Sequence, residues 1–76
     1  MGKLRVLSGR EVRQILEQHG FREVRRRGSH VVMQRPDPAT GTVTVVVPDH
    51  PEMRTGTLLS IIRQSRIARA AFESQQ

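Results

Sequence analysis

A β-hairpin at the centre of the fold is predicted by residues 21–35, which read FREVRRRGSHVVMQR. Gly28 and Ser29 separate two strand-like runs, and a glycine at the first position of a two-residue loop is typical of a type II′ turn. A loop of this length fixes the register of the hairpin, because it places Arg27 opposite His30.

This register divides the hairpin into two faces, since side chains alternate along a strand. One face is expected to be apolar, and the other is expected to carry cations beside an imidazole. The apolar face would hold Val24 (opposite Met33), Val31 and Met33, with Arg26 at its rim, and the other face would hold Arg25, Arg27 and His30.

A helix is predicted before the hairpin, over residues 8–19. Ser8 and Glu11 have the S-x-x-E spacing of a capping box. Apolar residues follow at helical spacing, and Gly20 is suited to end the helix. His19 lies at the polar edge of this helix, and we assign it no role.

After the hairpin, the sequence predicts a turn-rich connection over 36–41, a third strand over 42–47 and a second helix that Thr55 would cap. A turn or short helix is expected over 68–72. The apolar residues expected in the core of this half are Val43, Val45 and Val47 of the strand, and Leu58, Leu59, Ile61 and Ile62 of the helix.

The predicted order α-β-β-β-α gives an α+β fold, in which both helices cover one face of a three-stranded antiparallel sheet. At 76 residues the chain is expected to form a single domain over 1–76. A lead-in is expected over 1–7 and a frayed end over 73–76. The basic face of the hairpin would then be open to solvent.

The composition favours an anionic partner, either nucleic acid or an acidic protein, and the alternative is that the excess arginine only keeps a small domain soluble. Thirteen Lys and Arg residues against seven Asp and Glu residues give a net charge of +6, and twelve of these thirteen cations are arginine, whose planar fork suits phosphate or carboxylate. With two Phe and no Trp or Tyr, the chain lacks the stacking platform of single-strand binders. It has no cysteine and shows no secretory pattern or membrane span, so we expect a cytoplasmic protein without disulfides.

His30 is the candidate catalytic residue. An imidazole is suited to take the proton of a ribose 2′-OH near neutral pH. Arg25 and Arg27 beside it would stabilise the negative charge that builds up on the phosphate. The alternative is an ordinary hairpin histidine that faces water, which is the commoner state of a lone histidine.

Secondary candidates follow the third strand. His50 would supply a second proton-transfer or phosphate-binding group, or would only pair with Asp49 or cap the following helix. Thr55 and Thr57 open the second helix, where free N–H groups favour an anion, although ordinary capping explains them equally. The spacing of the three histidines matches no metal site, and no cofactor motif is present, so we predict neither a metal nor a cofactor.

Four segments together resemble the HicA family of toxins from bacterial and archaeal toxin–antitoxin systems. The G-S-H turn, the V-P-x-H strand end and the G-T-L helix start carry the likeness. One position departs from the family, which often has a glycine where this chain has Arg66. The segments are LSGREVRQILEQHGF (7–21), RRRGSHVV (25–32), VTVVVPDH (43–50) and GTLLSIIRQ (56–64).

The resemblance implies a fold like that of double-stranded-RNA-binding domains, and a ribosome-independent mRNA interferase that cuts RNA with a histidine and no required metal. The family's catalytic histidine is that of the G-S-H motif, which is His30 here. The resemblance also implies a HicB-type antitoxin that binds the toxin and covers this histidine in a heteromeric complex, and a role in stress-linked growth arrest.

The leading hypothesis is therefore a metal-independent endoribonuclease toxin, in which His30 acts on mRNA while Arg25, Arg27, Gly28 and Ser29 contact the RNA backbone. One alternative is a non-catalytic module that binds double-stranded RNA by shape. Another is a protein-interaction domain whose arginines meet an acidic partner. Intact RNA would identify the first alternative, and a lack of RNA affinity the second.

Overall fold

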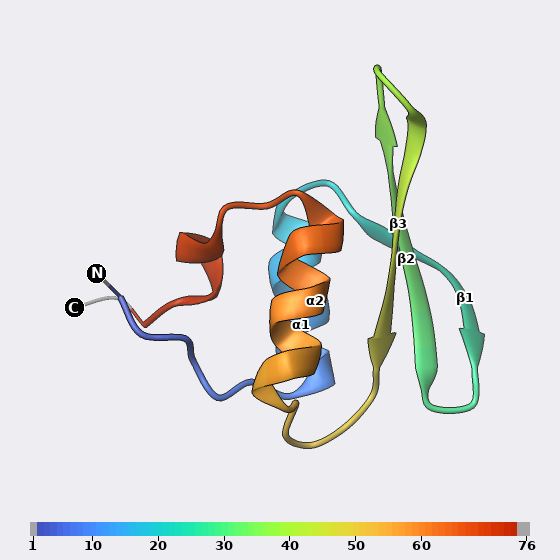
Figure 1. Ribbon diagram of the computed structural model, residues 1–76. Helices are drawn as coiled ribbons and strands as arrows, with labels where there is room; N and C mark the ends of the chain where they lie inside the picture. The colour runs from blue at the N-terminus through green and yellow to red at the C-terminus, as the bar shows by residue number, and fades with distance from the viewer. Residues whose placement is uncertain (1, 75–76) are drawn as a thin grey trace.

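The computed structural model describes residues 2–74 and confirms the predicted α+β class. The three strands form one antiparallel sheet in the order β1-β2-β3, and both helices lie on the same side of it (Figure 1). No helix in this part of the chain is long and apolar enough to cross a bilayer. The elements are α1 (Gly9–Gln18), β1 (Arg22–Arg27), β2 (His30–Asp37), β3 (Gly41–Pro48), α2 (Thr55–Ser65) and the 3-10 helix η1 (Arg69–Phe72).

The capping box predicted for α1 is present. The Ser8 hydroxyl accepts a hydrogen bond from the N–H of Glu11 at 3.1 Å, and the Glu11 carboxylate accepts one from the N–H of Ser8 at 2.8 Å. These two bonds hold the pKa of Glu11 below its ordinary value, because they favour the charged carboxylate. The sequence thus sets the start of α1 locally.

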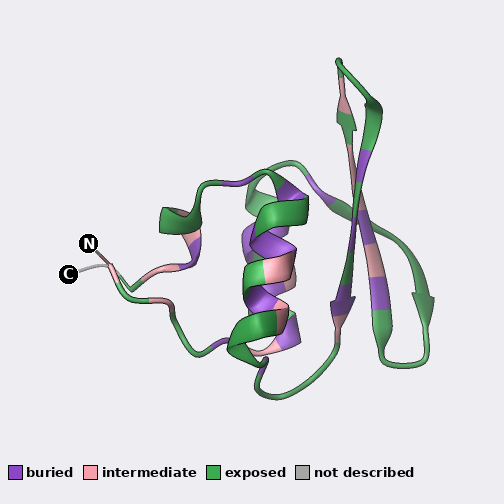
Figure 2. Ribbon diagram, viewed as in Figure 1, coloured by how far each residue is buried: buried purple, intermediate pink, exposed green. Residues whose placement is uncertain are grey.

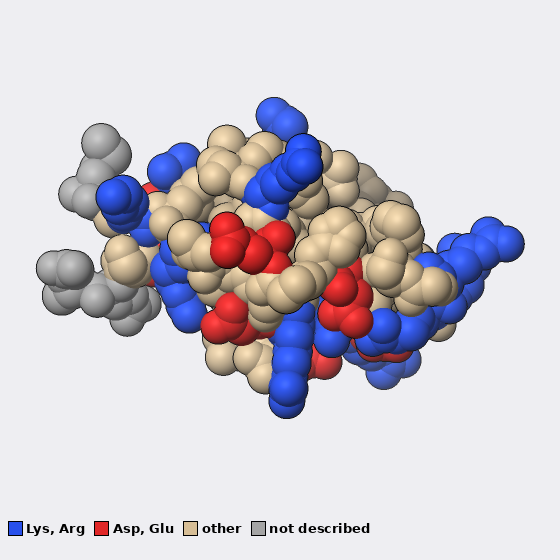
Figure 3. Space-filling model, turned by 90° about the horizontal axis from the view of Figure 1, so that it is seen from below, with Lys and Arg blue, Asp and Glu red and all other residues tan. Residues whose placement is uncertain are grey.

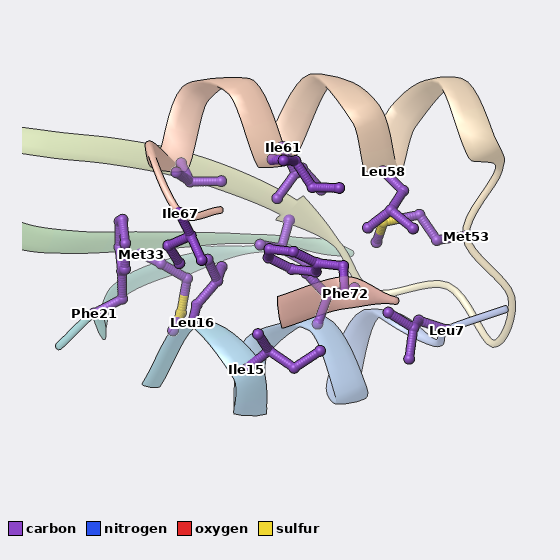
Figure 4. Packing of buried hydrophobic residues seen from close by; sticks show 14 of the residues in the cluster. Leu7, Ile15, Leu16, Phe21, Met33, Met53, Leu58, Ile61, Ile67 and Phe72 are labelled. Carbon is purple, nitrogen blue, oxygen red and sulfur yellow. The ribbon is translucent and has the colours of Figure 1, made fainter. Parts of the chain in front are cut away.

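The core lies between the sheet and the two helices. Buried and exposed residues alternate along β3, and the helices turn their buried sides inward (Figure 2). Phe72 of η1 is fully buried and lies between the α1 and α2 side chains (Figure 4). The predicted core is found except at Leu59, which is 39% exposed on the outer face of α2, and at Val24. The buried apolar residues are Leu7, Val12, Ile15, Leu16, Phe21, Val31, Met33, Val43, Val45, Val47, Met53, Leu58, Ile61, Ile62, Ile67 and Phe72.

The prediction for Val24 is wrong, because the register shifts at this residue. Met33 pairs with Glu23, whereas Val32 pairs with Arg25, so a β-bulge leaves Val24 unpaired and 47% exposed. The six residues of β1 are all exposed. A strand without a buried face has a weakly specified register beyond its turn, which is why strict alternation fails here.

Three boundaries also differ from the predictions. β2 and β3 extend into the expected connection, as far as Asp37 opposite Gly41. The cap of α2 is Arg54 and makes no side-chain hydrogen bond, whereas Thr55 is already helical. The expected frayed end does not include Glu73, which pairs with Leu4 in an isolated β-bridge.

The end of the described chain is therefore anchored. The N–H of Ser74 donates to the carbonyl of Lys3 at 2.8 Å, and the N–H of Arg5 donates to that of Phe72 at 3.0 Å. The remainder of the predicted frayed end, residues 75 and 76, and Met1 of the lead-in lie outside the described residues.

Candidate active site

The candidate site lies at the turn that joins β1 and β2. Gly28 has φ +58°, a left-handed value that suits glycine, and it sits at the first position of the two-residue turn as predicted. The turn pairs Arg27 with His30, and His30 pairs in turn with Pro48 of β3. His30 thus occupies the middle of a row that crosses all three strands.

His30 belongs to the face of the sheet that the helices leave open. Its neighbours in β2, Val31 and Met33, are buried in the core, and alternation directs His30 the other way. The residue is exposed, and no hydrogen bond among the described residues involves its ring. An imidazole in this state is accessible to a ligand.

Arginines of β1 lie beside His30 on the open face, as predicted for Arg25 and Arg27. Arg27 lies directly across from it, and Arg25 lies opposite Val32, the next residue on the same face. Arg22, opposite Gln34, continues this row beyond the bulge. Arginine side chains, drawn in blue, gather at the end of the molecule where β1 lies (Figure 3). The surface beside His30 can therefore hold the negative phosphates of a nucleic acid.

A groove of about 440 Å³ opens next to His30. It lies between α2 and β3, which is the edge strand of the sheet on that side. Of the residues predicted for the site, it brings together His30 and Thr57. His50 and Thr55 do not line it, and Arg25, Arg27, Gly28 and Ser29 lie outside it. The lining residues are His30, Val46, Pro48, Gly56, Thr57, Ser60, Ile61 and Gln64.

The loop after β3 fixes the backbone around the site. The N–H of Asp49 donates to the carbonyl of Ser29 at 2.6 Å, which ties this loop to the hairpin turn. The N–H of Gly9 donates to the carbonyl of His50 at 2.8 Å. His50 therefore contributes its backbone to the support of the site, while its side chain is exposed outside the groove.

Gly9 itself is required by close packing. A Cβ atom at this position would lie 2.3 Å from the carbonyl oxygen of Pro48 and 2.9 Å from the Cα atom of Asp49. α1 therefore begins directly against the end of β3. The capping-box pattern predicts the helix start but carries no signal of this tertiary contact.

Asp49 joins three segments through its carboxylate. One oxygen accepts from Arg13 of α1 at 2.8 Å, and the other accepts from Arg26 of β1 at 3.1 Å. These two hydrogen-bonded cations hold the pKa of Asp49 below its ordinary value. One prediction allowed Asp49 to pair with His50, but the carboxylate pairs with Arg13 and Arg26 instead. Its actual partners are distant in sequence, and the sequence offers no signal for them.

Metal ligands do not converge in the described part of the chain. No group of three or more His, Cys, Asp or Glu side chains within residues 2–74 is arranged to hold an ion. The site thus consists of one accessible imidazole, a row of guanidinium groups and a groove with hydroxyl and amide groups on its α2 wall.

Comparison with known families gives one match. Residues 9–67 match the family model described as "HicA toxin of bacterial toxin-antitoxin". This range covers most of the 76-residue chain, including the hairpin, His30 and the groove wall on α2. A search of curated proteins found no match.

Proposed function

The chain belongs to the HicA toxin family of bacterial toxin–antitoxin systems, and on this premise we propose that it is an endoribonuclease that cleaves mRNA with His30. The observation that carries the proposal is the state of His30 itself. Its ring is exposed and makes no hydrogen bond within the described residues, and it stands beside Arg27 in a three-strand row. Hydrogen bonds from Asp49 to the hairpin turn and from Gly9 to His50 support the backbone around this row.

In the proposed reaction, His30 takes the proton from a ribose 2′-OH, and the 2′-oxygen attacks the adjacent phosphorus. The bond from phosphorus to the 5′-oxygen breaks, this oxygen acquires a proton from water, and His30 gives its proton to the hydroxide that remains. The products are a 2′,3′-cyclic phosphate and a 5′-OH end. No step requires a metal or cofactor.

The arginines of the open face would bind the substrate backbone. Arg27 would contact the reacting phosphate and stabilise the charge on it, and Arg25 would contact a neighbouring phosphate. The hydroxyl of Ser29 would add a hydrogen bond at the turn, where Gly28 leaves room for the RNA. Binding of this kind weakens steeply as salt concentration rises.

The toxin family implies an antitoxin partner. We further propose that this partner is of the HicB type and inhibits by covering His30 and the arginine row. A surface with an exposed imidazole among cations would bind acidic side chains of a protein partner as readily as it binds phosphate.

The first test uses purified protein freed of any partner, labelled RNA and EDTA. Replacing His30 with alanine should lower the cleavage rate by at least about 10²-fold, the usual contribution of a general base. Thermal stability should be almost unchanged, because the side chain is exposed. Detection of a cyclic phosphate on the product would identify the reaction.

His50→Ala is the matched control, since His50 is also exposed but lies outside the groove. It should cleave at the parental rate. Cleavage by His30→Ala at the parental rate would refute the catalytic assignment. RNA binding without cleavage by any of the three proteins would instead favour a non-catalytic RNA-binding module, and a lack of RNA affinity would favour a protein-interaction domain.

A further inference from the structure

The groove between β3 and α2 has two unlike walls. On the sheet side it is lined by Val46, which is 44% exposed, and by Pro48. On the helix side, Thr57, Ser60 and Gln64 lie at positions i, i+3 and i+7, so they share one face of α2. An apolar wall facing a row of hydrogen-bonding groups fits a flat heterocycle with a polar edge.

From this arrangement we propose that the groove is a subsite for one unpaired base of the RNA substrate, and that Gln64 and Ser60 select this base. The proposal rests on the proposed ribonuclease function. It adds a specificity site on α2, an element that takes no other part in the reaction.

The hydrogen bonds of the helix wall leave capacity for a ligand. The side-chain nitrogen of Gln64 donates to the Ser60 hydroxyl oxygen at 3.3 Å. This bond uses one amide hydrogen of Gln64, and it leaves free the second amide hydrogen, the amide oxygen and the hydroxyl hydrogen of Ser60. Gln64 is thereby oriented by Ser60 and presents a donor and an acceptor together, as the edge of a base requires.

The chemistry of the cleavage explains why a base should lie there. Attack by the 2′-oxygen needs that oxygen, the phosphorus and the departing 5′-oxygen to approach a straight line, which the regular A-form helix does not permit. The reacting nucleotide must therefore leave the stack, and its base needs another binding surface within one nucleotide of the general base. The groove begins at His30, and its size lies within the usual range of small-ligand sites.

Charge also favours RNA as the occupant. The arginines opposite His30 and Val32 lie on β1, and the groove lies on the β3 side of His30, so a nucleotide whose phosphate contacts these arginines would reach the groove with its base. Among residues 2–74, no Asp or Glu lines the groove. A row of arginines beside a groove that has no described Lys or Arg in its lining suits a nucleotide, whose charge lies on the backbone and not on the base.

Blocking the groove is the first experiment. Ser60→Phe places a large side chain in the groove, whereas Leu59→Phe places the same side chain one residue away, on the outer face of α2. We expect Ser60→Phe to lower the cleavage rate by at least about tenfold, the effect of losing one ordinary hydrogen bond or more. Leu59→Phe should cleave at the parental rate, and circular dichroism should show both variants folded.

Selectivity is measured with a randomised RNA pool whose cut ends are sequenced. Gln64→Ala changes an exposed residue and should leave the fold intact, but it should flatten the base preference at the nucleotide next to the cut by about tenfold. Gln18→Ala, a change of the same kind on α1, should keep the parental preference. An unchanged preference in Gln64→Ala, in a protein that cleaves, would refute the proposed subsite.

A binding arm separates this proposal from the proposed function. Short 2′-fluoro oligonucleotides lack the attacking hydroxyl, so they report on the groove whether or not the protein cleaves. Their addition should shift the NMR signals of the Gln64 side-chain amide in the parental protein. Unshifted Gln64 signals despite binding through the arginines would overturn the base subsite alone. Shifted signals without cleavage of natural RNA would overturn the ribonuclease proposal and leave the subsite in place.

Discussion

The two ends of the β2–β3 ladder are supported in different ways. At the His30 end, contacts from α1, β1 and the β1–β2 turn converge on residues 48–50, and most of them join residues far apart in sequence. At the other end, the tip is held mainly by Asp37, whose carboxylate accepts from the N–H and hydroxyl of Thr40 at 2.9 and 2.7 Å. The end that carries the exposed histidine is the one whose backbone is held by long-range contacts, so an accessible side chain stands on a well-supported strand end.

The sharpest way to break this difference is Gly9→Ala. The added methyl would meet the backbone of Pro48 and Asp49, which cannot rotate away as a side chain could. We expect a loss of about 3 kcal/mol in the free energy of unfolding, typical of severe overpacking. Urea unfolding followed by circular dichroism measures this loss.

Gly56→Ala is the control for the same chemical change. A Cβ atom there meets nothing within 4 Å, and Gly56 lies inside a helix, where alanine is favoured. This variant should be at least as stable as the parent. An equal loss of stability in both variants would show that Gly9 has no special role in the support of the site.

A second change, Asp49→Asn, tests the ion pairs at the His30 end through pH. The pKa of Asp49 is held below its ordinary value of 3.8 by Arg13 and Arg26. A carboxyl with a lowered pKa in the folded state stabilises the fold above its unfolded pKa, and this contribution is lost as pH falls through the folded pKa. The loss therefore begins near pH 4 and grows below it.

The asparagine variant should be less stable than the parent at pH 7, and this difference should shrink when both are compared at about pH 3. Urea midpoints at the two pH values test the expectation. A difference that stays constant between them would mean that the charge of Asp49 does not support the site. Asp37→Asn is the matched variant at the tip, where Thr40 hydrogen bonds lower the pKa of Asp37.

The smallest expected effect is a gain in stability, and it comes from Arg66→Gly near the tip. Arg66 ends α2 with φ +63° and ψ +17°, a left-handed conformation that disfavours side chains with a Cβ atom. Glycine should stabilise the protein by up to about 1 kcal/mol, less a small loss from the exposed ion pair between Arg66 and Asp37 at 3.5 Å. Thermal unfolding of the variant and the parent tests this expectation, and the melting temperature of the variant should be higher. A lower melting temperature would show that the ion pair outweighs the backbone strain.

Arg66 also shows how far sequence reasoning reaches. Glycine, which the family often has there, suits a left-handed helix end, and the structure keeps that conformation with arginine. Buried Ser65 completes the helix end, since its hydroxyl donates to the carbonyl of Ile62 and accepts from the N–H of Ile67. Serine is not a usual sign of burial, so the sequence did not indicate this role.

Local patterns predicted the elements that depend on neighbouring residues. The capping box, the two-residue turn and the alternating valines of β3 need only short-range information, and all three are found. The bulge at Val24 was not predicted, because β1 has no apolar alternation to reveal it. The turn predicted that His30 would lie on the open face, because it sets the register of the hairpin. The groove could not be predicted in this way, because it depends on how α2 packs against β3.

The position of Phe72 has a consequence for the order of events during synthesis. A ribosome synthesises the chain from the N-terminus, so His30 and the arginine row emerge before Phe72. Phe72 is fully buried and lies between the side chains of the two helices (Figure 4). In a domain this small, a single large core side chain provides a substantial share of the contacts that hold the sheet against the helices. We therefore expect the surface that would act on RNA to be complete only after Phe72 has been synthesised and has packed into the core.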